Sequence, residues 1–467
     1  MNVILVVFDS LRKDCVNVLG APPWGKVHTP HFDAFAAESV VATRMYPESL
    51  PTLPTRRALY TGRRVYPFHN ADFRLKGDFV GAPGWGPIPE EQDTLAELLY
   101  EAGYRTGLVA DVYHMFKPSK NYTRGFEQWT FLRGQECDPG RSGPRLTEAE
   151  LARWMPPGQD KPKNMWFTQN CLTNLRDRTR EEEYFSPKVL REAAIWLEQN
   201  RDAERFFLTV ESFDPHEPWL VPGHYRQMYL AEDGPEQVHS GYKIHDLSDY
   251  MLRRTQANYS GSVTQCDRWF GYLMETARVL GLLDNTMIVL TTDHGHSIGD
   301  RGYIGKRGYP SAPEVFDVPL MIRLPGAEHA QARTDMFLNH TDLTAEILNR
   351  AGVAPKGQLD GKPFLDDALA GNAGHRDHVT VGWGSTPTVI TEEWWFNSKV
   401  DSTGAFLHDL TAEDPFAENL ADANPDVAKD LFAVAEADAE GGFPDWLVDL
   451  ARNQADAPGC SDVAARQ

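Results

Sequence analysis

Short apolar runs alternate with stretches of helical periodicity along most of the chain. Runs rich in Val and Ile predict buried strands, and continuous apolar runs of this length are typical of parallel strands covered on both faces. The expected strands are 2–8, 105–110, 205–211, 285–292 and 318–323. Helical spacing predicts intervening helices over 94–103, 187–199, 252–280 and 342–351. This alternation predicts an α/β fold with a mostly parallel sheet sandwiched by helices.

The pattern changes twice along the chain. Residues 120–183 are irregular and rich in Gly, Pro and charged residues, which indicates a long insertion that could line a binding site or form a lid. After Gly371, short strand-like runs precede an acidic, Ala-rich helical stretch at 425–437. We therefore expect a main domain over 1–370 and a small C-terminal α+β subdomain over 371–467, built on an antiparallel sheet and a helix.

Composition limits the classes of partner and the cellular compartment that we expect for this protein. The net charge of −21 argues against a nucleic acid or an anionic membrane as the main partner, because both bind Lys/Arg-rich surfaces. Five scattered cysteines without a CxxC pair indicate free thiols. The apolar run 2–8 is too short to cross a bilayer and has no cleavage site, so we expect a cytoplasmic protein. We expect the main partner to be a small-molecule substrate. The sequence leaves open whether the chain forms a homo-oligomer.

Polar residues fall where the predicted strands end. Asp9 follows the first strand, Asp214 and His216 follow the 205–211 strand, and Asp293 and His294 follow the 285–292 strand. Ligands bind at this edge of an open α/β sheet, and a carboxylate beside an imidazole suits a divalent cation. Taken singly, each residue has a simpler interpretation as a turn or cap residue.

The stretch from Ser49 to Gly62 is the most specific one. Thr52 lies between two prolines just before a predicted helix, so its hydroxyl is held rigidly. A helix N-terminus offers backbone N–H groups to an anion, and Arg56 offers a guanidinium fork. His340 comes just before another predicted helix, where a structural role is the simpler interpretation.

Together these segments resemble the sulfatase branch of the alkaline phosphatase superfamily over nearly the whole chain. The matching segments are Val6–Asp9, Thr29–Ala36, Thr52–Arg56 with Thr61-Gly62, Pro215–Pro218, Thr292–Gly295 with Gly302 and Lys306, His408–Leu410, Asp414-Pro415, and Glu418–Leu420. The resemblance implies a metal-dependent ester hydrolase, with 1–370 as its catalytic domain.

Three departures from the sulfatase pattern shift the expected chemistry. The family has Cys or Ser where this chain has Thr52, and oxidises it to formylglycine; the methyl group on the Thr Cβ should prevent that. Asp111 stands where a Lys is expected, and Ser10 where a second Asp is expected. These changes resemble the phosphatase and phosphodiesterase members, in which a Thr or Ser oxygen is the nucleophile.

The resemblance also implies a ligand set for divalent metal ions, two in number, with Mn or Zn preferred and Ca or Mg as alternatives. The first ion would be held by Asp9, Thr52, Asp293 and His294. The second would be held by Asp214, His216 and His340, with Asp111 and His114 as further candidates. The catalytic residues implied are Thr52, Arg56, His216 and Lys306.

The resulting hypothesis is hydrolysis of an anionic phosphate ester (a diester, a monoester or a phosphonate ester) through a covalent phosphothreonine at Thr52. A sulfuric ester hydrolase that works without formylglycine is the nearest alternative. A non-catalytic metal- or anion-binding protein on this fold is an alternative of another class, and a phosphoryl transferase also stays open. No motif specifies the leaving group.

Overall fold

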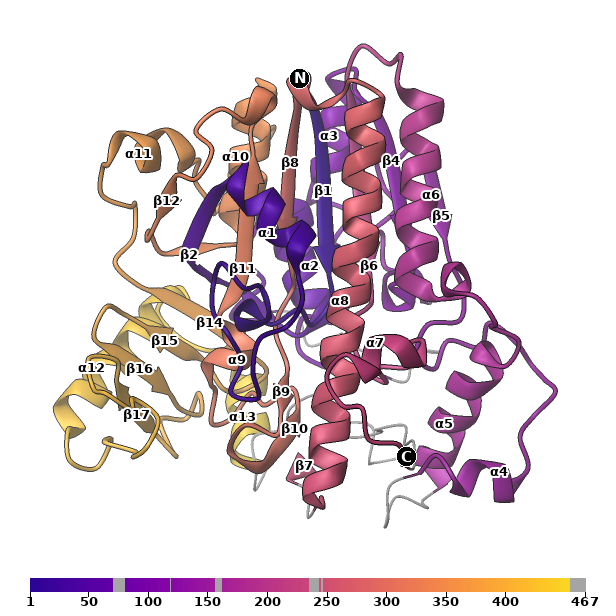
Figure 1. The fold of residues 1–467 in the computed structure, drawn as a ribbon. Coiled ribbons are helices and arrows are strands. Elements are labelled where there is room, and N and C mark those ends of the chain that lie inside the picture. The colour runs from indigo at the N-terminus through magenta and orange to yellow at the C-terminus, as the bar shows by residue number, and fades with distance from the viewer. Residues whose placement is uncertain (70–79, 118, 156–161, 235–242, 245–246, 454–467) are drawn as a thin grey trace.

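The computed structural model describes residues 1–69, 80–117, 119–155, 162–234, 243–244 and 247–453, and it confirms the α/β class. Within these residues the main sheet has nine strands (Figure 1). At its centre β1 (Asn2–Phe8) pairs in parallel with β6 (Phe206–Ser212) and β8 (Thr286–Thr291). Beyond β6, β4 (Arg105–Ala110) and β5 (Gln128–Phe131) continue the parallel arrangement.

The other half of the sheet contains the one reversal of direction seen in its described strands. There β11 (Val318–Arg323) lies antiparallel to both β8 and β2 (Val40–Tyr46). β12 (Arg333–Thr334) and β13 (Leu338–Asn339) pair in parallel with β2. The sequence pattern did not identify β2, and it did not indicate the direction of β11.

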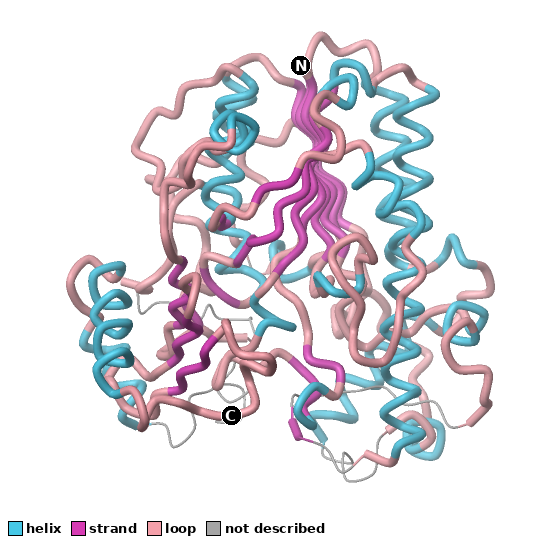
Figure 2. The backbone as a smooth tube through the Cα atoms, turned by 60° about the vertical axis from the view of Figure 1, so that its left-hand side comes forward, coloured by secondary structure: helices cyan, strands magenta, loops and turns pink. Residues whose placement is uncertain are grey.

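Helices cover both faces of this sheet (Figures 1 and 2). On one face lie α1 (Pro30–Ala37), α6 (Phe185–Asn200) and α8 (Asp249–Val279), and on the other lie α2 (Thr52–Thr61), α3 (Leu95–Glu101) and α10 (His340–Ala351). Side chains of a strand alternate between faces, so Val3, Leu5 and Val7 join one core. Their neighbours Ile4, Val6 and Phe8 join the other. A strand buried on both faces explains the unbroken apolar runs in the sequence.

A second sheet lies beside the main one. Its strand order is β17 (Phe406–Asp409), β16 (Trp394–Asn397), β15 (Thr388–Ile390), β14 (Val379–Trp383) and β3 (Ser49–Leu50). β14 to β17 are antiparallel, and α12 (Pro425–Asp438) packs against them. β3 comes from the N-terminal part of the chain and pairs in parallel with β14. The boundary at 370 stays a prediction, but this sheet contains more than C-terminal residues.

The shorter elements complete the description. They are α4 (Glu148–Ala152), α5 (Pro162–Leu175), α7 (Gly223–Gln227), β7 (Lys243–Ile244), β9 (Ser297–Ile298), β10 (Tyr303–Gly305), α9 (Pro313–Phe316), α11 (Leu365–Ala370) and α13 (Asp445–Asn453). Within the expected insertion, β5 joins the main sheet while α4 and α5 pack on each other. Among the described helices, none has the length and apolar character needed to cross a membrane.

Candidate active site

Acidic side chains gather at the carboxyl ends of the three central strands. Asp9 directly follows β1, Glu211 lies near the end of β6, and Asp293 follows β8 by two residues. Because these strands are parallel neighbours, their ends meet at one edge of the sheet. The Ser10 amide donates to Asp293 Oδ1 at 3.1 Å, which joins two of these strand ends directly.

Asp9, Asp293 and His294 form a group that suits a divalent cation. One possible ligand atom from each lies within 4.8 Å of the others, and all three residues are buried. His294 Nδ1 donates to the Gly295 carbonyl at 2.9 Å, which leaves Nε2 as a lone-pair donor. Within the described residues this buried Nε2 makes no hydrogen bond, and it lies 3.4 Å from Asp293 Oδ2. Burial lowers the pKa of His294 to about 3, so the ring is neutral, as a metal ligand must be.

The two carboxylates of this group have opposite pKa shifts. Burial and the neighbouring Asp293 raise the pKa of Asp9 well above its usual value. Burial alone would raise the pKa of Asp293. His294 and Arg56 lower this pKa, and the net shift is downward. Two carboxylates held this close repel each other, and a bound cation would relieve that repulsion.

Arg56 ties this group to the first turn of α2. Its side chain is fully buried, and Nη1 lies 3.0 Å from Asp9 Oδ2 and 2.5 Å from Asp293 Oδ2. The same nitrogen donates to the Thr52 carbonyl at 3.2 Å, while Nε donates to Glu211 at 2.9 Å. Arg56 therefore anchors the carboxylates to the helix that carries Thr52. Its Nη2 is buried and makes no hydrogen bond with any residue that the structure describes, which leaves the N–H groups of this nitrogen for a bound anion.

Thr52 is the first residue of α2 and only 1% exposed. β3 precedes it, so pairing with β14 fixes the direction from which the chain enters the helix. Thr55 holds the same turn by donating its hydroxyl to the Ser49 carbonyl. The Thr52 side chain is thus buried at a helix N-terminus, where backbone dipoles favour negative charge.

A second group of possible ligands lies beside the first. Glu136, His216 and Glu217 offer ligand atoms within 4.8 Å of one another. His216 Nδ1 donates to the Glu217 carbonyl at 2.8 Å, and Nε2 accepts from Lys306 Nζ at 2.8 Å. Lys306 also lowers the pKa values of Asp9 and Asp293, so this ammonium acts electrostatically on both groups.

One further residue, His296, contacts the second group. His296 Nε2 lies 2.9 Å from Glu217 Oε2, and its Nδ1 lies 3.0 Å from the Ser297 carbonyl. Burial and then Glu217 raise the pKa of Glu136 to about 7. The group therefore contains one carboxyl, that of Glu136, which can exchange a proton near neutral pH, whereas burial lowers the pKa of the His216 imidazole well below its usual value.

The other ligands proposed for a second ion lie in different surroundings. Gln135 donates to Asp214 at 2.8 Å and to Asp111 at 3.3 Å, and burial raises the pKa of both carboxyls. His340 Nε2 bonds the Thr292 carbonyl at 2.8 Å. The His114 ring packs against the Tyr113 ring in a tilted arrangement, with ring centroids 4.0 Å apart. Among the described residues, neither ligand group contains Asp214 or His340, and their role as ligands stays a prediction.

Four site residues escaped the sequence reasoning: Glu211, Glu136, Glu217 and His296. Glu211 lies at the end of a predicted strand, so the argument that selected Asp9 could have found it. Glu217 lies next to His216 within the recognised segment Pro215–Pro218, and His296 lies two positions after His294, just beyond the recognised segment Thr292–Gly295. Glu136 lies in the irregular stretch 120–183, where no pattern indicates which side chain turns inward.

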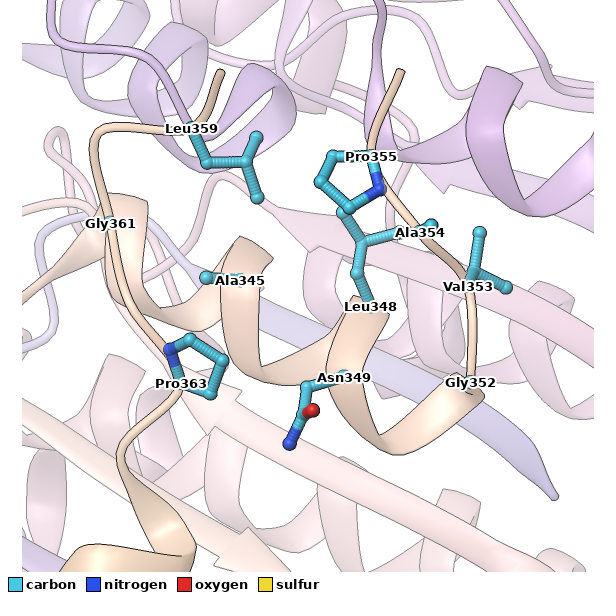
Figure 3. A pocket seen from close by; sticks show the side chains of 10 residues that line it. All are labelled: Ala345, Leu348, Asn349, Gly352, Val353, Ala354, Pro355, Leu359, Gly361 and Pro363. Atoms are coloured by element: carbon cyan, nitrogen blue, oxygen red, sulfur yellow. The ribbon is translucent and has the colours of Figure 1, made fainter. Parts of the chain in front are cut away.

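A pocket of about 430 Å³ lies away from this chemistry (Figure 3). It is lined mainly by apolar residues around Leu348, Gly352 and Pro355, at the C-terminal end of α10. The helix begins at His340, beside the Thr292 carbonyl. Its 12 residues span roughly 18 Å, so the pocket and the carboxylates lie near opposite ends of α10.

The fold and site are those of an ester hydrolase of the alkaline phosphatase and sulfatase type: a carboxylate–imidazole group that could hold a cation lies at the carboxyl edge of a parallel sheet, and Arg56 links it to the helix turn that carries Thr52. The sulfatase family model matches residues 1–353, and the chain belongs to the sulfatase family.

The proteins to which this chain is similar include both an arylsulfatase and a phosphonate monoester hydrolase. It is 26% identical to the multifunctional alkaline phosphatase superfamily protein PehA of Trinickia caryophylli, over 78% of this chain and 76% of that protein. It is 23% identical to an arylsulfatase of Clostridium perfringens, over 85% and 86%. The solved phosphonate monoester hydrolase of Agrobacterium radiobacter superposes with a TM-score of 0.72 and 20% identity, over 94% and 95% of the two chains.

Proposed function

We propose that this protein hydrolyses phosphorus esters (phosphate or phosphonate esters) with the Thr52 hydroxyl as the nucleophile. The observation that carries the proposal is the buried Thr52 on the first turn of α2, tied through Arg56 to Asp9 and Asp293. An aldehyde at this position would require breaking a carbon–carbon bond of the Thr side chain. Thr52 therefore acts as a hydroxyl, which suits attack on phosphorus.

Asp9, Asp293 and His294 would hold a divalent cation, with Mn and Zn as the first candidates. When bound, such an ion supplies Lewis acidity towards ester oxygens and the nucleophilic oxygen. The unpartnered His294 Nε2 between two carboxylates supports this assignment. For a second ion, Lys306 is a competing positive charge, because its ammonium already bonds His216 Nε2.

The chain's own residues then have distinct tasks. Arg56 holds the helix turn and directs its Nη2 donor towards a bound anion. The Thr52 hydroxyl releases its proton to solvent, and its Oγ forms a bond to phosphorus as the bond to the leaving oxygen breaks. Lys306, hydrogen-bonded to His216, donates a proton to that oxygen, and a water molecule later cleaves the Thr52 ester. The substrate is a small anionic ester, attracted by this local set of cations in an otherwise acidic protein.

Hydrolysis of a sulfate ester is the second candidate. It is favoured by the family itself and by the similarity to the arylsulfatase over most of both chains. In that case Thr52 would attack sulfur directly, because the hydrate of an aldehyde could not form.

The test compares turnover of nitrophenyl phosphate, bis-nitrophenyl phosphate, a nitrophenyl phosphonate ester and nitrophenyl sulfate, with Mn or Zn added. We expect a phosphorus ester to be preferred. Thr52→Ala should lower turnover at least about 10³-fold, and Thr52→Ser should keep much of it, because it keeps the hydroxyl. Metal content, measured in all three proteins, controls for loss of the cation. Preference for the sulfate ester, or near-normal turnover by Thr52→Ala, would reject the proposal.

A further inference from the structure

A cation-rich pocket of about 160 Å³ lies where the 120–183 segment meets the start of α6. Arg133, Arg141, Arg178 and Lys188 line it. Four cations around one pocket are unusual in a protein with a net charge of −21. The volume is far above the ~10–15 Å³ needed to hold one water molecule, so a small polyatomic ion fits.

Two of the four cations already have acidic partners. Arg133 donates to Asp138 at 2.7 and 2.9 Å, and Arg141 pairs with Asp177. These contacts leave Arg178 and Lys188 as the other two cations of the pocket.

Arg178 and Lys188 have no such partner. In the described part of the chain, neither side chain makes a hydrogen bond or an ion pair, and Arg178 Nη1 is buried. The Arg178 guanidinium lies 3.8 Å from the centre of the Phe185 ring, which holds it in place. Burial lowers the pKa of Arg178 to about 10, and burial together with Arg178 and Arg141 lowers the pKa of Lys188.

Among the described residues, the nearby acids form no ion pair with Arg178 or Lys188, because their carboxylates accept hydrogen bonds from other groups. Glu183 also lines the pocket, but its carboxylate accepts from the amides of Thr179 at 2.6 Å and Arg180 at 3.0 Å. Asp214 acts on Arg178 only at longer range, because its carboxylate is engaged by Gln135 and the Ser186 amide. The N-terminus of α6, a helix of 16 residues, adds positive potential at Phe185 and Ser186.

The pocket adjoins the catalytic groups along the chain. Arg133 and Gly134 line it. The next residue, Gln135, bridges Asp111 and Asp214, and Glu136 belongs to the group around His216. The same short segment thus contributes to the pocket and to the catalytic edge of the sheet.

We propose that Arg178 and Lys188 form a binding site for an oxyanion (a phosphate, sulfate or carboxylate group), and that this group is a second anionic substituent of the substrate. The first part stands independently, while the second rests on the proposed ester hydrolysis. The same oxyanion chemistry could come from a free inorganic ion, and the experiment separates the two sources.

The binding arm uses inorganic phosphate and calorimetry on the metal-loaded protein. Arg178→Gln/Lys188→Gln is compared with Arg201→Gln/Lys429→Gln, which changes the net charge equally at exposed positions outside the pocket. Phosphate bound at the catalytic site is common to both proteins, so a difference between them reports on the pocket. Loss of two charged donors should weaken the pocket site at least about tenfold. Lys188→Gln alone, at a partly buried position, gives a second measurement should the double variant fold poorly. Equal phosphate binding by all variants would overturn the site.

The kinetic arm uses two nitrophenyl phosphonate esters that differ only in a distal carboxylate. We expect kcat/KM of Arg178→Gln/Lys188→Gln to fall at least about tenfold on the carboxylate ester and to stay unchanged on the parent ester. Loss of phosphate binding without this discrimination would assign the pocket to a free oxyanion and overturn the substrate assignment. If no phosphorus ester is hydrolysed at all, the proposed function is wrong, but the calorimetry still measures whether the pocket binds phosphate.

Discussion

Replacing Arg56 with Met would test whether this guanidinium holds the site together. The change removes a guanidinium that contacts Asp9, Asp293 and Glu211, whose side chains are all fully buried. Removing one partner of a buried ion pair typically costs about 3–5 kcal/mol. With about 2.1 cal/mol/K of unfolding entropy per residue, a chain of 467 residues has about 1 kcal/mol/K in total, so the melting temperature should fall by about 3–5 °C.

The assay is thermal unfolding at one fixed scan rate, with chelator and with added Mn. A dication near Asp9 and Asp293 would replace part of the lost positive charge, so the deficit should shrink when Mn is present. Arg278→Met is the matched control, because Arg278 is 51% exposed and pairs with Glu275 at 3.1 Å. Such surface pairs contribute only about 0–1 kcal/mol, which is at most about 1 °C here. If Arg56→Met melts like Arg278→Met, or if Mn leaves the deficit unchanged, the interpretation of this site is wrong.

Three further predictions follow from the same geometry. Asp293→Asn should weaken Mn or Zn binding at least about tenfold, measured by competition with a chelator, since it removes a charged ligand; unchanged affinity would exclude Asp293 as a ligand. Burial lowers the pKa of His216, and the Glu217 carboxylate partly offsets this by raising it, so Glu217→Gln should lower the pKa of His216. The part of the kcat/KM–pH profile that reports His216 titration should then move to lower pH. An unchanged profile would show that Glu217 does not influence the site. Asp267, far from this site in the chain, has its pKa raised to about 7 by burial; its contribution to stability is complete below about pH 4 and is lost as pH rises through about 7. Asp267→Asn should therefore flatten the decline in melting temperature over that range, and an unchanged slope would reject this account.

The central strands were predictable because each is buried on both faces. β1, β4 and β11 were expected with the bounds that the structure has, and β6 and β8 differ by one residue at each end. β2 was missed because Thr43 and Arg44 interrupt its apolar run, VVATRMY, where two of its seven residues are only partly buried. The direction of β11 depends on which neighbours it pairs with, and an apolar run carries no information about pairing.

The site residues that lie at the ends of central strands could be predicted from the sequence. The other site residues were harder to predict. Asp9, Asp293 and His294 are brought together by parallel neighbours, and that consequence of topology could be stated in advance. Whether Asp214 turns towards His216 or towards Gln135 depends on side-chain packing after the strand ends, at the Asp214-Pro215 turn. The contribution of Glu136 depends on an irregular segment, for which neither periodicity nor strand order constrains side-chain direction.

The charges around Thr52 suggest why a cation would affect substrate binding as well as turnover. If ionised, Asp9, Asp293 and Glu211 carry three negative charges, while Arg56 and Lys306 carry two positive ones. The metal-free group is then net negative and repels an anionic ester at short range, where the low dielectric strengthens the interaction. A bound dication would reverse that sign. Chelation should therefore raise KM for an anionic ester as well as lower kcat, whereas an ion needed only to activate the nucleophile would lower kcat and leave KM unchanged.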